Sequence, residues 1–241
     1  MSNSDHYLAI PRCGSGRGVL VLHSWWGLNT FFRNVCERLA SKGFVALAPD
    51  LYGGKVADTP SAARRLRASA TTGRREPVYK FLMREIEYLR RHEAVTGWAI
   101  GQLGFSMGGH WAFWLAQQAE LPIGATVTFY AARSGDFSRS RSSFLCHFAE
   151  DDDWVSSAAI KKLARRLDSA GVSATFHQYP RTKHWFFESD RTDSFEPKSA
   201  DLAWKRTLGF LKVSLPRSNV RRKAVGAAQQ QHATAGASRR R

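Results

Sequence analysis

The chain of 241 residues is long enough for one large domain with a sizeable core, and its 43% hydrophobic content is that of a globular protein. No run approaches the roughly 18 uninterrupted apolar residues that a membrane helix needs, and the N-terminus has no secretion-signal pattern. The three cysteines form no Cys-x-x-Cys pair. We therefore expect a cytoplasmic protein with reduced thiols and no membrane segment.

Much of the net charge of +16 lies at the C-terminus, where residues 216–241 carry seven basic and no acidic side chains, leaving +9 for the rest. The Ala, Gln, Ser and Gly residues of this segment show no periodicity. We predict a single folded domain at residues 1–215 and a disordered basic tail at 216–241. Such a tail could bind nucleic acid or another polyanion weakly and without specificity. We favour the simpler interpretation of a solvated appendage that aids solubility.

Strand-like and helix-like runs alternate along the chain. Strands are expected at 18–23, 44–48, 98–103, 124–130, 143–148 and 173–179. Helices are expected from Asn29 or Thr30 to Gly43, then at 77–91, 110–116, from Ser156 or Ser157 to 170, and at 199–213. Residues 53–75 are expected to form a loop with a short helix that begins at Pro60. This alternation predicts an α/β fold with a mostly parallel central sheet and helices on both faces.

A Gly-x-Ser-x-Gly sequence stands between the strand at 98–103 and the helix after it, with Ser106 at its centre. At a strand-to-helix junction this pattern is typical of a nucleophile elbow. The turn is so tight that its flanking positions favour glycine, and it lifts one hydroxyl above the sheet. Ser106 is therefore the predicted nucleophile.

A serine hydroxyl needs a base that takes its proton and an acid that orients the base. In hydrolases with this elbow the chain order is serine, acid, histidine. His184 follows the last predicted strand and is the expected base. Asp151, Asp152 and Asp153 follow the preceding strand, and only one of the three can face the imidazole.

Two backbone N–H groups are expected to stabilise the oxyanion of the tetrahedral intermediate, those of Met107 and Trp25. Four tryptophans fall at the tips of the same predicted loops and predict an aromatic-lined pocket: Trp25, Trp26, Trp154 and Trp185. No histidine or cysteine spacing suits a metal, so we expect no metal ion.

Five stretches together resemble one family. They are Val-Leu-His-Ser-Trp-Trp-Gly-Leu-Asn at 21–29, Gly-Phe-Val-Ala-Leu-Ala-Pro-Asp-Leu-Tyr-Gly at 43–53, Gly-Phe-Ser-Met-Gly-Gly at 104–109, Asp-Asp-Trp-Val at 152–155 and His-Trp-Phe at 184–186. On these motifs residues 18–211 resemble the dienelactone hydrolase family. The resemblance implies a small single-domain α/β-hydrolase with no large lid and no cofactor, which acts on lactones or small esters. The family's Asp-x-x-Val pattern implies Asp152 as the acid.

The chain departs from the family's original members at three positions. Those members have a cysteine nucleophile where this chain has Ser106, and a glutamate at the position of Ser24. They also bind the substrate carboxylate with an arginine at the position of Glu188. We expect Ser24 and Glu188 to line the substrate pocket, and a carboxylate at position 188 to favour a neutral ester or lactone. Arginines of the loop at 53–75 could supply an anion site instead, but the sequence does not place them: Arg64, Arg65, Arg67, Arg74 and Arg75.

The sequence thus predicts a serine hydrolase that cleaves small carboxylic esters or lactones through an acyl-enzyme. A second hypothesis is a non-catalytic binding protein that keeps the hydrolase fold, since folds outlast functions. A third is polyanion binding through the basic tail, with or without catalysis.

Overall fold

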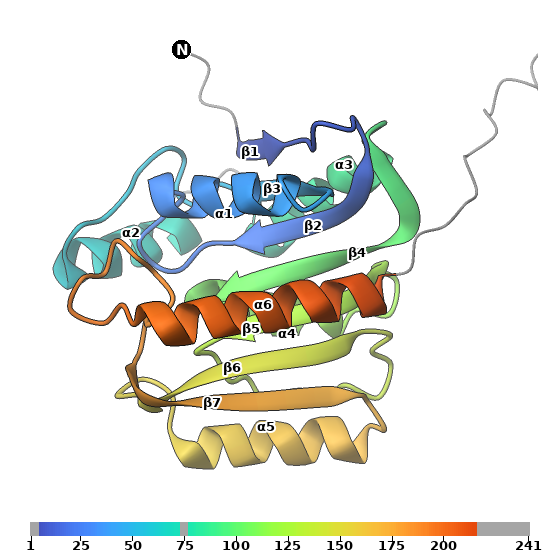
Figure 1. Ribbon diagram of the computed structural model, residues 1–241. Helices are drawn as coiled ribbons and strands as arrows, with labels where there is room; N and C mark the ends of the chain where they lie inside the picture. The colour runs from blue at the N-terminus through green and yellow to red at the C-terminus, as the bar shows by residue number, and fades with distance from the viewer. Residues whose placement is uncertain (1–4, 73–76, 216–241) are drawn as a thin grey trace, which may run out of the picture.

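A computed structural model of the protein describes residues 5–72 and 77–215; the basic tail predicted at 216–241 lies outside the described residues (Figure 1). The strands are β1 (His6–Ala9), β2 (Gly16–Leu22), β3 (Phe44–Pro49), β4 (Val95–Phe105), β5 (Ile123–Phe129), β6 (Ser143–Asp151) and β7 (Ala174–Lys183). The helices are α1 (Thr30–Ala40), α2 (Pro60–Thr72), α3 (Val78–Arg91), α4 (Met107–Ala116), α5 (Ser157–Ser169) and α6 (Pro197–Ser214).

The seven strands form one sheet in the order β1-β3-β2-β4-β5-β6-β7. Only β1 runs antiparallel to its neighbour, β3, while every other pair is parallel. Parallel strands need helical crossovers, which cover both faces of the sheet. The mostly parallel sheet with helices on both faces, predicted from the alternation of elements, is confirmed.

The period-2 geometry of the strands divides the core into layers. On β2, Val19 and Val21 face the layer that contains α1 and α6, whereas Leu20 and Leu22 face the layer of α3 and α4. All four side chains are fully buried. Figure 1 shows α1 and α6 lying side by side across the near face of the sheet. Burial of each such side chain contributes roughly 1.5–3 kcal/mol to the stability of the fold. The central strands therefore hold the loops at their ends in fixed positions.

Helix ends follow the predicted capping residues. The side chain of Asn29 accepts a hydrogen bond from the N–H of Phe32 at the start of α1, and that of Ser156 accepts one from Ala159 at the start of α5. Gly43 and Gly171 follow these helices with φ of +85° and +67°, values that favour glycine.

The structure departs from the predicted elements in three places. The short strand β1 was not expected, because four residues at an edge carry little periodic signal. Most of the loop expected after Gly53 is helix α2, because alanine and arginine favour a helix and Ala63 is buried against its neighbours. Strand β7 continues through Pro180, which an edge strand tolerates.

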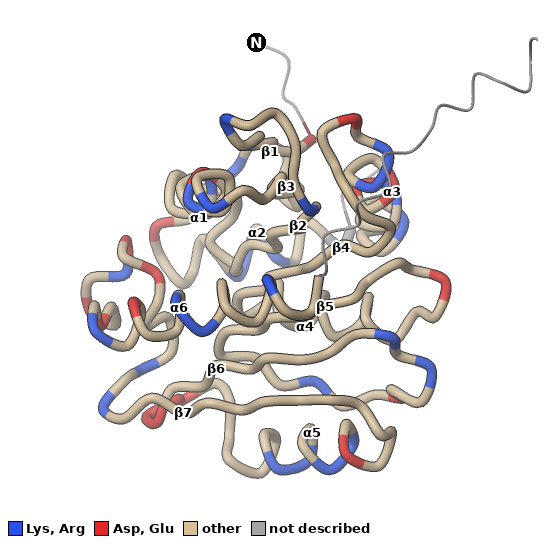
Figure 2. The backbone as a smooth tube through the Cα atoms, turned by 45° about the vertical axis from the view of Figure 1, so that its right-hand side comes forward, with Lys and Arg blue, Asp and Glu red and all other residues tan. Residues whose placement is uncertain are grey.

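Charged residues lie mainly on helices and loops, while the central strands are largely uncharged (Figure 2). Within residues 5–72 and 77–215, no helix is both long and apolar enough to cross a membrane.

Candidate active site

Ser106 occupies the sharp turn between β4 and α4 and has φ 49° and ψ −109°, a conformation that L-residues rarely adopt. Its backbone N–H donates to the carbonyl of Phe129 at 3.0 Å. A Cβ on Gly104 would lie 2.5 Å from the carbonyl oxygen of Gly108, and a Cβ on Gly108 only 2.1 Å from that of Leu22. Glycine is therefore required on both sides of the serine, and the turn presents the hydroxyl above the sheet.

The hydroxyl of Ser106 meets the imidazole of His184. The distance from Ser106 Oγ to His184 Nε2 is 2.9 Å, and His184 Nδ1 lies 2.8 and 2.9 Å from the two carboxylate oxygens of Asp152. The side chains of His184 and Asp152 are 5% and 3% exposed. A carboxylate that accepts from Nδ1 leaves the lone pair of Nε2 facing the serine hydroxyl, as general-base catalysis requires.

Sheet register explains why residues so far apart in sequence meet. Asp151 and Lys183 are partners at the ends of β6 and β7, so the next residues, Asp152 and His184, leave the sheet side by side. Of the three candidate aspartates, only Asp152 contacts the imidazole, while Asp151 and Asp153 are exposed at the surface. Asp152 Oδ1 also accepts the backbone N–H groups of Trp154 (2.8 Å) and Val155 (3.0 Å), which hold the carboxylate in place.

The two expected oxyanion donors belong to residues of the cavity wall. Trp25 and Met107 both line the same cavity as the serine, and the backbone N–H of neither has an acceptor among the described residues. The loop that carries Trp25 is held by His23. The Nδ1 of this residue lies 2.6 Å from the carbonyl of Ser24, and its Nε2 accepts the N–H of Leu51 at 3.1 Å.

The cavity at the serine has a volume of about 320 Å³. Three of the four tryptophans line it: Trp25, Trp154 and Trp185. The rings of Trp25 and Trp185 are stacked with centroids 5.9 Å apart, and Trp154 lies against Trp25 at 5.0 Å. Trp26 packs behind this group and is not part of the cavity wall. The aromatic wall therefore comes from loops after β2, β6 and β7.

Ser24 and Glu188, which we expected in the substrate pocket, do not reach it. Both are fully buried, and neither belongs to the cavity wall. Ser24 Oγ donates to Glu188 Oε2 at 2.9 Å, and the hydroxyl of Tyr130 donates to Glu188 Oε1 at 2.7 Å. The reason for expecting a neutral substrate, a carboxylate facing the pocket at position 188, therefore does not hold.

Positively charged side chains line the cavity instead. Arg67 of α2 and Arg133, which follows β5, both contribute to the wall, together with His110 of α4. Desolvation, followed by the positive charges of Arg133 and Arg67, lowers the pKa of His110 and favours its neutral form. Within the described part of the chain, no aspartate or glutamate lines this cavity. Sequence reasoning could not locate these arginines because only the tertiary fold brings them to the serine.

Seven further residues of the cavity wall were not predicted from sequence: Leu51, Tyr52, Ala70, Val78, Trp111, Tyr130 and Val155. The hydroxyl of Tyr52 donates to the sulfur of Met107 at 3.3 Å. Tyr52 lies in the stretch at 43–53 that resembles the family. That resemblance is a sequence signal that could have placed Tyr52 at the site. In the described residues, no group of three or more histidine, cysteine, aspartate or glutamate side chains could hold a metal ion.

A serine on a strand-to-helix elbow, with histidine and aspartate from the following loops of a mostly parallel sheet, defines an α/β-hydrolase. The chain belongs to the dienelactone hydrolase family, whose model matches residues 5–215. The resemblance seen in the sequence motifs is thereby confirmed.

Two curated relatives illustrate the similarity. Protein usf of Aquifex pyrophilus is 31% identical over 215 residues, which cover 87% of this chain and 93% of the relative. A Bradyrhizobium protein named a probable 2-oxo-3-(5-oxofuran-2-ylidene)propanoate lactonase is 28% identical over 224 residues, covering 87% and 89% of the two chains.

Solved structures share the fold. The structure titled m3DLH has a TM-score of 0.76 and 25% identity, covering 88% of this chain and 92% of its own. A dienelactone hydrolase-like promiscuous phosphotriesterase from metagenomic libraries has a TM-score of 0.78 at 22% identity, with the same coverage.

Proposed function

We propose that this hydrolase of carboxylic esters or lactones is a serine enzyme that works through an acyl-enzyme, with Ser106 as nucleophile, His184 as base and Asp152 as the acid that orients it. The observation that carries the proposal is the pair of contacts made by the His184 imidazole, 2.9 Å to Ser106 and 2.8 Å to Asp152. The spacing is that of hydrogen bonds along which a proton can move.

The mechanism follows from this geometry. Ser106 Oγ attacks the substrate carbonyl carbon while His184 Nε2 takes its proton, and the N–H groups of Trp25 and Met107 bind the resulting oxyanion. His184 then protonates the leaving oxygen as the acyl–oxygen bond breaks. In a lactone the leaving hydroxyl stays attached to the acyl group, because the ring opens. Water, activated by His184, releases Ser106 from the acyl-enzyme.

The first test is Ser106→Ala. We expect turnover of p-nitrophenyl acetate to fall by several orders of magnitude, about 10⁶-fold in comparable serine enzymes, because the nucleophile is lost. A fluorophosphonate should label the wild type at Ser106 alone, as read by mass spectrometry. Folded wild-type protein that resists the label, or a variant with unchanged turnover, would refute the assignment.

We further propose that the substrate carries a carboxylate. Two arginines and no acidic side chain line the described cavity wall, so an anionic substrate would be attracted to it. The Bradyrhizobium relative is named for a lactone with a propanoate group, which is such an anion. Arg67 lies exposed at the rim and Arg133 is partly buried, which suits contact with a charged group at the cavity mouth.

This second prediction compares p-nitrophenyl hemisuccinate, which has a free carboxylate, with uncharged p-nitrophenyl butyrate. Arg67→Ala and Arg133→Ala should each lower kcat/KM for the hemisuccinate by roughly 10-fold, since a hydrogen bond to a charged group contributes about 1.5–3 kcal/mol and the rim is partly solvated. The butyrate should be hydrolysed as before. Arg64→Ala, on the same helix but outside the cavity wall, is the matched control. Equal losses with both esters would count against the proposal.

The alternative of a non-catalytic binding protein predicts no fluorophosphonate labelling, so the first test separates it from the enzyme. Polyanion binding by residues 216–241 is a separate prediction, tested by nucleic-acid binding across a range of salt concentrations. The cytoplasmic location expected from the sequence composition is also a proposal.

A further inference from the structure

The carboxyl group of Glu188 lies buried between three loops of the candidate site, yet no part of this residue lines the cavity. The pKa of Glu188 is raised to about 8, mainly because burial disfavours the charged form. The hydrogen bond from Tyr130 acts against this shift, the charge of Asp190 adds to it, and the Ser24 hydrogen bond and the charge of Arg191 oppose it. A raised carboxyl pKa means that the folded state disfavours the ionised form. Burial of this carboxyl group is therefore costly, and the hydrogen bonds from Ser24 and Tyr130 offset part of that cost.

The two partners of this carboxyl group come from the loops that build the site. Ser24 follows β2 and directly precedes Trp25, whose N–H is a proposed oxyanion donor. Tyr130 follows β5 and is adjacent to Phe129, whose carbonyl accepts the N–H of Ser106. Glu188 itself lies four residues after His184. One carboxyl group therefore connects the oxyanion loop, the loop beside the elbow and the loop of the base.

Tyr130 makes the connection to the base directly. Its ring centroid lies 4.8 Å from that of His184, and its side chain is fully buried. Tyr130 also has φ 40°, a left-handed conformation that costs a bulky residue about 1–3 kcal/mol and persists only where surrounding contacts impose it. The hydrogen bond to Glu188 is such a contact, since it anchors the far end of the ring that packs against the imidazole.

We propose that Glu188 is a positioning residue: through Tyr130 it fixes the imidazole of His184, and through Ser24 it fixes the N–H of Trp25. The inference rests on the proposed serine mechanism. Glu188 has no contact with substrate in this role; it sets the geometry of the groups that do. Displacement of reacting groups by about 1 Å can lower a rate 10²-fold.

Two substitutions separate positioning from plain structural support. Glu188→Leu removes both hydrogen-bond acceptors at similar volume, and we expect kcat for p-nitrophenyl acetate to fall about 10²-fold with KM changed less than 3-fold. Glu188→Gln can keep both bonds if one hydroxyl turns to accept from the amide, so it should retain kcat within about 3-fold.

The difference in stability between Glu188→Gln and the wild type should depend on pH. Because the folded-state pKa of Glu188 is above its unfolded value, its contribution to stability is present at low pH and is lost as pH rises through about 8. Glu188→Gln does not ionise, so its melting temperature should gain on the wild type as pH rises from 5.5 to 9. If Glu188 only stabilised the fold, kcat would fall and rise together with the melting temperature across the variants.

Glu85 offers a matched control. It is also a buried glutamate, 3% exposed, but it lies on α3 and bonds to His6 at 2.7 Å, away from the cavity. Glu85→Leu should lower the melting temperature and leave kcat at the wild-type value. If Glu188→Leu does not fold, Ser24→Ala and Tyr130→Phe remove one donor each, and each should lower kcat by roughly 10-fold.

The rate of fluorophosphonate labelling at Ser106 gives a second readout, because it depends on the triad and oxyanion donors more than on substrate binding. Slow labelling in Glu188→Leu and near wild-type labelling in Glu188→Gln would support the proposal. An active wild type together with full kcat in Glu188→Leu, or in both single-donor variants, would overturn the role of Glu188 alone. A wild type that is neither active nor labelled would overturn the serine mechanism and this inference together.

Discussion

At the scale of single residues, the candidate site depends on how Asp152 is held. One of its oxygens faces the imidazole and two backbone N–H groups at once, so the carboxylate cannot turn away from His184. Residue type and chain order predicted an acid in this loop, but three adjacent aspartates have the same chemistry. The choice depends on the pairing of Asp151 with Lys183, which is a property of the sheet. The sequence alone identified Asp152 only through a family pattern.

Asp152→Asn tests this residue. The amide can present its NH₂ to His184 Nδ1, which would favour the tautomer with the proton on Nε2, where it cannot accept from Ser106. We expect kcat to fall about 10⁴-fold with the fold intact, as for the corresponding change in a well-studied serine protease. Asp153→Asn, an exposed neighbour, is the control and should keep full activity. Ester hydrolysis and circular dichroism of both variants would check this, and equal kcat values in the two would contradict it.

At the scale of elements, the site is built where strands end. Ser106, Tyr130, Asp152 and His184 all follow the carboxyl ends of parallel strands, which meet at one edge of the sheet. Strong periodicity made these strands predictable. The sequence could not show that α2 extends far enough to bring Arg67 to the cavity, nor that Tyr130 and Glu188 share a hydrogen bond. Both facts depend on contacts between segments that are distant in sequence, and local patterns do not contain them.

Gly108→Ala tests the elbow that presents the nucleophile, and Gly209→Ala on α6 is its control. Gly108→Ala would place a methyl group 2.1 Å from the carbonyl oxygen of Leu22, so the elbow and β2 must separate. We expect loss of esterase activity and a lower melting temperature. Gly209 lies on an exposed part of α6, where a new methyl group would have no atom within 4 Å. Gly209→Ala should therefore stabilise the protein by roughly 0.5–1 kcal/mol. Thermal unfolding of the two variants would measure both changes in melting temperature, and equal changes would contradict the close packing around Gly108.

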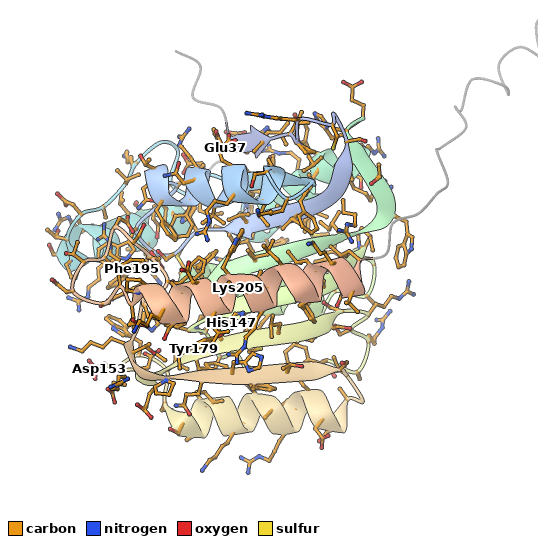
Figure 3. The ribbon with its side chains drawn as sticks, in the orientation of Figure 1. Glu37, His147, Asp153, Tyr179, Phe195 and Lys205 are labelled. Carbon is orange, nitrogen blue, oxygen red and sulfur yellow. The ribbon has the colours of Figure 1, made fainter. Side chains whose placement is uncertain are left out.

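At the scale of the whole molecule, a buried polar link joins the sheet to α6. His147 of β6 is fully buried; its Nδ1 lies 2.8 Å from the hydroxyl of Tyr179, and its Nε2 lies 3.1 Å from Thr207 Oγ1 of α6. Figure 3 shows His147 and Tyr179 beside α6, over the last two strands. The link holds α6 against the same strands whose ends carry Asp152 and His184. Protonation of His147 should therefore affect the stability of the fold.

His147 predicts how the stability of the fold depends on pH. Burial, with the nearby charges of His177 and Arg206, holds the pKa of His147 well below its ordinary value. A depressed folded-state pKa contributes stability above the unfolded value of about 6.5, and this contribution is lost as pH falls below it. The wild type should therefore lose stability between pH 7.5 and pH 5. His147→Gln, which lacks the titrating ring, should be less stable at pH 7.5 because hydrogen bonds and packing are disturbed, but its loss on acidification should be smaller. Urea unfolding at the two pH values would measure both slopes, and parallel losses in the two proteins would show that another group controls the acid sensitivity.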